Sequence, residues 1–419
     1  MKIRQQNLML HEDWAVVLLG FITIVVTLSG FVLPIPVYNW SNGTDLVYKV
    51  FSTHNIQLLL WQWVFVTVVA ALGALVTGKS IKSMLVGFPL VYMLTVVALI
   101  VAGSAQVRGL NLEAVIISLS IGLLLSNLFT IPAWLKQALS TELYVKVGLI
   151  LLGTSVLFGD ILKAGTLGLI QALLVVVSVW YVAYWVCKKL KVDSEMTMML
   201  ASAVSICGVS AAIATSGAIK GDSKKLSYVI SLVLITAIPM MIGMPYLAHY
   251  LGLSQEVTGA WLGGTIDTTG AVVASGTLVG EKALKISTIV KFSQNVLLGI
   301  AAFAISIYWS YTKQPEVGGA TEKPSFRVIW ERFPKFVIGF VAASLIFSVI
   351  ISPTVITEVK GSFKNLQSLW FTLAFTSIGL ETKISDLFKH ENRKPLYAFL
   401  IAQTFNVLIT LAIALVLFR

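Results

Sequence analysis

Thirteen apolar stretches, each close to the length of a bilayer crossing, recur along this chain of 419 residues. A transmembrane helix needs about 20 consecutive, mostly apolar residues, whereas the strands of a membrane barrel alternate over about 10 positions. These stretches do not alternate, so we expect an all-α polytopic membrane protein with about 11–13 transmembrane segments. The stretches lie at 14–33, 58–78, 84–102, 112–131, 145–159, 167–187, 196–219, 226–247, 257–280, 286–309, 335–352, 366–380 and 395–418.

The composition excludes several other classes of protein. Hydrophobic residues make up 57% of the chain and charged residues only 12%, whereas soluble domains contain about 25% charged residues. This fraction of charged residues is too low for an ordinary soluble enzyme, a disordered chain or a nucleic-acid-binding protein. The lipid bilayer is therefore an expected partner, and nucleic acid is not.

The 30 lysines and arginines favour a cytoplasmic N-terminus. With thirteen crossings in that orientation, inside segments carry 18 of these residues and outside segments carry 11. Cytoplasmic loops of membrane proteins carry the excess of positive charge, so we expect a multi-pass protein of the cell (inner) membrane. The bias inverts after the stretch 196–219, which predicts that this stretch does not cross as one continuous helix.

The longest polar interval divides the expected membrane helices. It covers residues 311–334, contains three prolines and two glycines, and is typical of a linker. We therefore expect a membrane bundle over 1–310 that contains the stretches 196–219 and 257–280. Further membrane helices would follow over 335–419, within one integrated transporter domain.

Small residues cover every face of two stretches, 196–219 and 257–280. Small residues on one face permit close helix packing, and packing remains an alternative for both stretches. Gly-interrupted segments in corresponding positions are also typical of the discontinuous helices of transporters with inverted repeats. A broken helix presents free N–H groups and a positive dipole end within the membrane, where an anion can bind. We favour two broken helices that meet near the midplane.

One acid and one base, Asp267 and Lys291, stand inside these apolar segments. Ionisable groups within a membrane are costly and mark functional sites by default. The two residues could form a structural ion pair. Alternatively, Lys291 attracts an anionic substrate and Asp267 couples transport to H⁺ or Na⁺. The polar residues Gln403, Thr404 and Asn406 are expected to form interhelical hydrogen bonds.

The sequence offers no cluster of residues typical of an enzyme or a metal site. The two cysteines, Cys187 and Cys207, lie in apolar stretches, and the four histidines are scattered. Clustered histidines and carboxylates, which a metalloenzyme needs, are not evident. We expect no enzymatic activity, no metal and no cofactor other than a coupling ion, and we see no repeated channel filter.

Several motifs resemble the YeiH-type sulfate exporter family, which is related to the bile-acid and sodium/proton antiporter folds. Ile206–Ala212 matches the family's Cys-Gly-x-Ser-Ala signature, and Trp261–Ile266 followed by Val272–Gly276 matches its second motif. Thr288–Lys291 and Gly379–Thr382 are similar to two further motifs. The resemblance extends from about residue 112 to residue 419.

The chain departs from the family at two places. It has Ile266-Asp267-Thr268 where the family usually has Ile-His-Glu, and it has Gln294 where the family usually has Arg. The resemblance implies a homodimeric secondary transporter of a small anion (sulfate, sulfonate or a small carboxylate) with an elevator-like mechanism. The alternative is a cation/proton antiporter that uses Asp267 as the carrier carboxylate. The expected substrate-binding residues are Ser205, Cys207, Gly208, Ser210, Thr265, Thr268, Thr269, Lys291 and Gln294, and the expected coupling residue is Asp267.

Overall fold

The computed structural model describes residues 12–29, 35–109, 114–313, 330, 333–382 and 393–419. Over these residues the chain is helical and contains no β-strand, as the apolar stretches predicted. Each of the thirteen stretches coincides with one helix or with a pair of consecutive helices. The prediction of an all-α polytopic fold is therefore confirmed.

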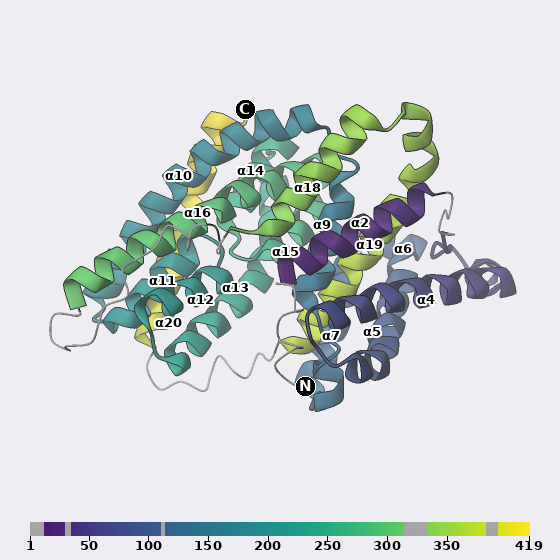
Figure 1. Ribbon diagram of the computed structural model, residues 1–419, viewed down its shortest axis with the longest axis horizontal. Coiled ribbons are helices and arrows are strands. Elements are labelled where there is room, and N and C mark those ends of the chain that lie inside the picture. The colour runs from purple at the N-terminus through teal and green to yellow at the C-terminus, as the bar shows by residue number, and fades with distance from the viewer. Residues whose placement is uncertain (1–11, 30–34, 110–113, 314–329, 331–332, 383–392) are drawn as a thin grey trace. The chain divides into compact units, whose positions relative to one another are not determined.

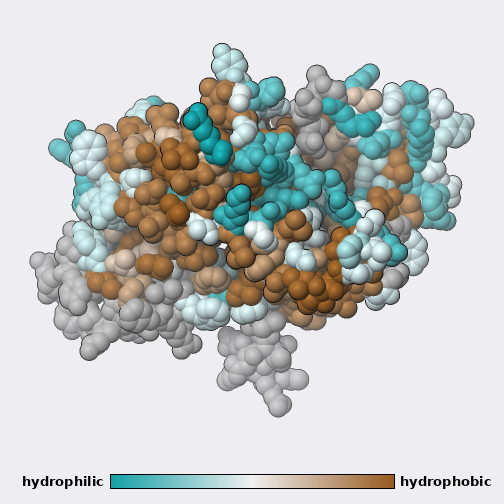
Figure 2. Space-filling model, turned by 90° about the horizontal axis from the view of Figure 1, so that it is seen from above, coloured by the Kyte–Doolittle hydropathy of each residue, from teal (hydrophilic) through white to brown (hydrophobic). Residues whose placement is uncertain are grey.

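Six helices in the described part of the chain are long and apolar enough to cross a membrane. Their outer faces carry the apolar side chains that lipid requires. On α10 (Phe158–Lys189), for example, Leu169, Leu173 and Val177 are exposed at four-residue spacing, while Val175 and Val179 on another face are buried. Figure 2 shows such hydrophobic side chains over broad areas of one face of the molecule.

The chain divides into two compact units, and each consists of two separate segments of the sequence. Unit 1 contains residues 1–159 and 335–383, and unit 2 contains residues 160–334 and 384–419. This division differs from the contiguous one that we expected, with a bundle over 1–310 followed by 335–419. Most of the expected linker 311–334 lies outside the described residues, and α16 extends to Lys313.

Unit 1 is built around two glycines that let its helices α7 and α19 approach closely. A Cβ atom at Gly122 would lie 2.6 Å from the carbonyl oxygen of Thr376, and one at Gly379 would lie 2.5 Å from that of Leu119. The helical segments of unit 1 are α2 (Glu12–Leu28), α3 (Gly43–Asp45), η1 (Leu46–Val50), α4 (Thr53–Val76), α5 (Ile81–Ala102), α6 (Ala105–Gly109), α7 (Ala114–Leu128), α8 (Ala133–Lys136), α9 (Thr141–Gly153), α18 (Lys335–Leu345), η2 (Ile346–Ile350) and α19 (Pro353–Glu381).

Unit 2 consists of long helices around two broken ones. In Figure 1 its teal and green helices α10–α16 are joined by the yellow C-terminal helix α20. Helix α20 packs on α11 and α14. The helices of unit 2 are α10 (Phe158–Lys189), α11 (Ser194–Ser205), α12 (Val209–Ile219), α13 (Ser223–Tyr250), α14 (Gln255–Thr265), α15 (Thr269–Val279), α16 (Glu281–Lys313) and α20 (Lys394–Leu417).

Specific contacts explain why the C-terminal helices separate between the two units. In unit 1, the hydroxyls of Thr95 and Thr376 hydrogen-bond at 2.9 Å and join α5 to α19. In unit 2, the indole of Trp261 donates to the carbonyl of Val407 at 2.9 Å and joins α14 to α20. These partners are far apart in sequence, so the position of a polar linker could not predict them.

Helix caps explain where the helices of unit 2 begin. Asp193, Asp222, Ser254 and Thr268 each precede a helix, and their side-chain oxygens accept hydrogen bonds from N–H groups of the first turn. A broken helix followed by a long one occurs twice, as α11/α12 then α13 and as α14/α15 then α16. This recurrence agrees with the expected inverted repeat, which stays a prediction.

Candidate functional site

The first helix break lies between α11 and α12, at Ile206-Cys207-Gly208. Gly208 has φ +57° and ψ −110°, a backbone conformation that side chains strongly disfavour. A Cβ atom there would lie 2.6 Å from Cγ1 of Val233 and 3.0 Å from Cβ of Asp267. Glycine therefore permits both the break and the close approach of Asp267.

The second break lies between α14 and α15, at Ile266-Asp267-Thr268. Asp267 is only 1% exposed, and its Oδ2 atom has no hydrogen-bond partner. Thr268 begins α15, and its hydroxyl accepts a hydrogen bond from the N–H of Ala271. The two predicted broken helices are thus confirmed, and their breaks lie against each other at Gly208 and Asp267.

Lys291 and Gln294 reach both breaks from α16. The ammonium of Lys291 donates to the carbonyl of Ile206 at 2.7 Å and to Oε1 of Gln294 at 2.8 Å. The amide of Gln294 in turn donates to the carbonyls of Ser205, at 2.9 Å, and Gly264, at 3.2 Å. Gln294 therefore links the ends of α11 and α14 and orients Lys291.

Two amide side chains of α20 complete this network. The amide of Gln403 donates to the carbonyl of Thr265 at 3.1 Å. Asn406 donates to the carbonyls of Val204, at 3.1 Å, and Thr265, at 3.2 Å. The predicted interhelical hydrogen bonds of Gln403 and Asn406 are confirmed, while the hydroxyl of Thr404 bonds within α20. The sequence did not indicate that α20 reaches the breaks, although the three-residue spacing places both amides on one face.

At the first break, the network leaves the end of α11 and the beginning of α12 in different electrostatic states. Carbonyl oxygens at the ends of α11 and α14 receive hydrogen bonds from Lys291, Gln294, Gln403 and Asn406. The beginning of α12 has no side-chain cap. An uncapped helix N-terminus carries a partial positive charge. The negative helix ends are therefore neutralised by the protein, whereas this positive end is not capped by a side chain.

Lys291 and Asp267 do not form the direct ion pair that was one alternative. Among the residues that the structure describes, the ammonium hydrogen-bonds to Ile206 and Gln294, and no contact with Asp267 lies within ion-pair distance. Both side chains are 1% exposed. Two buried ionisable groups that do not pair directly are costly to keep charged.

The structure brings together six of the expected site residues. Cys207 and Gly208 lie in the first break, Asp267 lies in the second, and Thr265 ends α14 beside it. Lys291 and Gln294 contact the ends of these helices, as described above. Cys207 is also close enough to Lys291 for an electrostatic interaction.

The four remaining residues lie differently. The hydroxyl of Ser205 bonds back to its own helix, at the carbonyl of Ala201, and Ser210 is exposed. The hydroxyls of Thr268 and Thr269 accept hydrogen bonds from the N–H of Ala271 and the amide of Asn295. Three of these four hydroxyls therefore already have a protein partner, and the role of all four in substrate binding stays a prediction.

The small residues also serve helix packing, as the alternative interpretation held. Gly259 and Gly263 let α14 approach the backbone of α16, where Cβ atoms would lie 2.8 Å and 2.4 Å from the carbonyls of Ala283 and Ser287. Gly264 faces Gln171 of α10. Packing and helix breaks therefore coexist in the same segments.

The C-terminal motif Gly379–Thr382 lies in unit 1 and has structural contacts. The hydroxyl of Ser126 donates to the carbonyls of Gly379 and Thr382, at 2.9 Å and 2.8 Å. Glu381 accepts a hydrogen bond from Thr141. These contacts satisfy the end of α19 and join it to α7.

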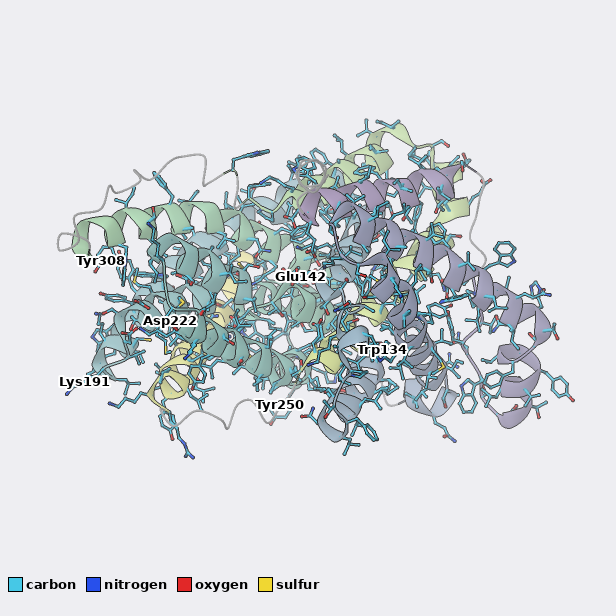
Figure 3. All side chains as sticks on the ribbon, turned by 60° about the horizontal axis from the view of Figure 1, so that its bottom comes forward. Trp134, Glu142, Lys191, Asp222, Tyr250 and Tyr308 are labelled. Carbon is cyan, nitrogen blue, oxygen red and sulfur yellow. The ribbon has the colours of Figure 1, made fainter. Side chains whose placement is uncertain are left out.

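Two ion-pair clusters lie near helix ends outside the breaks. In unit 2, Lys225 bonds to Asp193 at 2.7 Å and to Glu195 at 3.1 Å, next to Asp222, which Figure 3 labels. Burial raises the pKa of Asp193, but the hydrogen bonds from Lys225 and the helix N–H groups outweigh it and hold this pKa below its ordinary value. In unit 1, Lys146 pairs with Asp13. These clusters hold helix ends together.

Within the described part of the chain, no group of three or more His, Cys, Asp and Glu side chains could hold a metal ion. Cys187 and Cys207 are both buried, and neither forms a disulfide within the described residues.

Comparison with known proteins gives a family and no solved structure. A family model described as conserved hypothetical protein 698 matches residues 86–398. A UPF0324 membrane protein of Rhodopirellula baltica is 39% identical over 364 residues, which are 84% of this chain and 67% of that protein. No solved structure matches the chain.

Other relatives carry the same description. A UPF0324 membrane protein of Nitratidesulfovibrio vulgaris is 38% identical over 83% of this chain and 62% of its own length. One of Nitrosomonas europaea is 26% identical over 90% of this chain and 89% of its own length. The chain thus spans 62% to 67% of the length of the first two relatives. These relatives and the six long apolar helices agree on a multi-pass membrane protein.

Proposed function

This chain belongs to the family described as conserved hypothetical protein 698, whose relatives are UPF0324 membrane proteins, and from that premise we propose that it is a secondary active transporter. The observation that carries the proposal is the meeting of two broken helices beside the buried charges of Asp267 and Lys291. Discontinuous helices and intramembrane charges are typical of substrate and ion sites in transporters. We propose transport rather than an enzymatic reaction.

The substrate that we propose is a small anion, such as sulfate, a sulfonate or a small carboxylate. The uncapped beginning of α12 and the ammonium of Lys291 supply the positive charge that would attract it. The resemblance of Ile206–Ala212 to the signature of YeiH-type sulfate exporters supports this choice. The substitution of the usual arginine by Gln294 is consistent with a site that has a single buried cation.

We propose that Asp267 couples anion transport to H⁺ or Na⁺. With Asp267 ionised, its charge opposes that of Lys291, and the site is close to neutral. A proton or Na⁺ on the carboxylate leaves the charge of Lys291 and the helix terminus uncompensated, and the site then favours an anion. Each ligand therefore increases the affinity for the other, which is the thermodynamic requirement for coupling.

A second candidate is cation/proton antiport with Asp267 as the carrier. The unpartnered Oδ2 of Asp267 favours it, because a buried carboxylate oxygen without a donor can bind a cation or a proton. In that case no anion binds, and Lys291 competes electrostatically with the transported cation.

The remaining features of the proposal concern the whole protein. We propose an elevator-like step in which unit 2, which contains both breaks, moves as one body. We further propose a homodimer in the cell (inner) membrane with a cytoplasmic N-terminus, as the distribution of lysine and arginine favours.

The test is thermal unfolding of the purified chain with a panel of small anions, each with and without Na⁺ and at two pH values. A ligand at a hundred times its dissociation constant stabilises the folded state by about 2.7 kcal/mol. We expect one class of anion to raise the melting temperature, and Na⁺ or low pH to enhance the effect. Stabilisation by Na⁺ or pH alone would favour the antiporter, and no response to any of them would overturn both candidates.

A chemical probe provides an independent measurement at the first break. The sequence has two cysteines, so Cys187→Ser leaves Cys207 as the single thiol. The bound anion should protect Cys207 from a small maleimide. A matched pair of variants, Lys291→Met at the site and Lys285→Met on the same helix, separates loss of the buried charge from loss of any lysine. Protection of Cys207 by the anion should vanish in Lys291→Met and persist in Lys285→Met.

A further inference from the structure

Buried oxygen atoms without hydrogen-bond partners are concentrated in unit 2. Of the nine such side-chain atoms among the described residues, six belong to unit 2, and all six are oxygens. Buried polar atoms in native proteins nearly always have partners, so unpaired ones indicate an unseen water or ion. The six are on Gln171, Thr265, Asp267, Thr288, Asn295 and Gln403.

Three of these six side chains lie at or next to the second break. Thr265 and Asp267 are two residues apart at the end of α14. Gln403 of α20 hydrogen-bonds to the backbone of Thr265 at 3.1 Å and also interacts with the carboxyl of Asp267. The unpartnered atoms are Oγ1 of Thr265, Oδ2 of Asp267 and Oε1 of Gln403, and these side chains are 1%, 1% and 5% exposed.

The hydrogen-bond network fixes which atom of Gln403 is the unpartnered one. The atom beside the carbonyl of Thr265 must be a donor, so it is the amide nitrogen, and the amide oxygen is the atom that remains. Asn406 donates to the same carbonyl from the next helical turn. The oxygen of Gln403 is therefore oriented by contacts that do not involve any ligand.

We propose that these three oxygens bind a monovalent alkali cation, with Na⁺ as the natural probe, and that this cation is the coupling ion. This inference rests on the proposed function and makes it specific. Hard cations prefer carboxylate, amide and hydroxyl oxygens, which are the three types present. One carboxylate among the ligands matches the single charge of an alkali ion.

The geometry favours a cation over a proton. A proton on Asp267 would satisfy that carboxyl and one neighbouring oxygen, and the third oxygen would stay unpaired. A cation bound by all three would give each of these oxygens the partner that it lacks in the protein. The ammonium of Lys291 does not take this place, because its hydrogen bonds go to Ile206 and Gln294.

The experiment measures thermal stabilisation of the full chain by NaCl, LiCl and KCl against choline chloride, at constant chloride concentration and pH 8. We expect saturable stabilisation by at least one alkali ion. Loss of an outer-shell partner weakens metal sites about 10–100-fold, so loss of a direct ligand in Thr265→Val should weaken binding by at least about tenfold. Thr265→Ser, which keeps the hydroxyl, should bind the cation with an affinity close to that of the unchanged protein.

Two further variants keep the test decisive. Gln403→Leu removes the oxygen while Asn406 still satisfies the carbonyl of Thr265, so we expect a folded protein with weakened cation binding. Thr236→Val is the matched control, because its hydroxyl bonds only within α13. It should bind the cation as the unchanged protein does.

The outcomes separate this inference from the proposed function. If an anion stabilises the protein in a pH-dependent way and no alkali ion has any effect, the inference is overturned and proton-coupled anion transport stands. If alkali ions bind and no anion does, the cation site stands and the anion proposal fails. Equal cation binding by Thr265→Val, Gln403→Leu and the control would also overturn the assigned ligands.

Discussion

Replacing Gly208 by alanine should destabilise unit 2 more than an ordinary helix substitution does. The residue has φ +57° and ψ −110°, a conformation that costs a residue with a side chain about 1–3 kcal/mol. The new methyl group would also lie 2.6 Å from Cγ1 of Val233 and 3.0 Å from Cβ of Asp267. Forced overpacking costs about 1–3 kcal/mol more, so we expect a total of about 2–6 kcal/mol.

The same substitution should also disturb ligand binding. Any relief of the contact with Asp267 moves the carboxyl of the second break relative to the first break. Gly208→Ala is therefore expected to weaken cation and anion binding together, even under conditions in which the variant is folded. A merely destabilised protein would keep its ligand affinities once temperature is lowered well below its melting point.

The assay is a denaturant titration in detergent micelles, with Gly243→Ala as the matched control. Gly243 lies in α13 of the same unit, and a Cβ atom there would meet nothing within 4 Å. Because alanine is the better helix former, the control should be more stable by about 1 kcal/mol. If Gly208→Ala unfolds at the same denaturant concentration as the unchanged protein, the reasoning about the first break is refuted.

Three further predictions use the same titration. Gln294→Leu leaves two carbonyls at helix ends without this donor. Each loss should lower the free energy of unfolding by about 1–3 kcal/mol. Gly122→Ala places a methyl group 2.6 Å from the carbonyl oxygen of Thr376. This overpacking should lower the free energy of unfolding by about 1–3 kcal/mol. Lys225→Met costs only about 0–1 kcal/mol at pH 7. Because the folded-state pKa of Asp193 is lowered, this last difference should shrink as the pH falls below about 4.

Each of these predictions has a clear contrary result. A Gln294→Leu protein as stable as the unchanged one would mean that the amide does not link the two breaks. Unchanged stability of Gly122→Ala would refute close packing of α7 on α19. A Lys225→Met difference that grows in acid would contradict the sign of the pKa shift.

Much of the fold could be predicted from the sequence, because local composition fixes it. Runs of about 20 apolar residues can satisfy their backbone within lipid only as helices. The small residues and the inverted charge bias around 196–219 likewise indicated a break, because glycine at Gly208 is a local requirement of the backbone. The buried charges of Asp267 and Lys291 were visible for the same reason, since any charge in an apolar run is conspicuous.

The use of each polar group could not be predicted in this way. Ser205, Thr268 and Thr269 are hydroxyl residues near the breaks, yet their hydroxyls bond to protein atoms. Gln294 was expected as a substrate ligand, and the structure adds that its amide joins the ends of two helices. A hydroxyl or amide has several potential partners, and which one it meets depends on neighbours distant in sequence.

The sequence by itself determined the helices, the two breaks and the presence of one acid and one base within apolar segments. Only the tertiary structure decided that α20 joins unit 2, where the amide of Gln403 donates to the carbonyl of Thr265, and that α18 and α19 join unit 1. The physical reason is that helix formation and lipid exposure depend on neighbouring residues, whereas packing depends on close contacts such as Gly122 with Gly379. Such contacts join residues more than 200 positions apart and leave no periodic signal in the sequence.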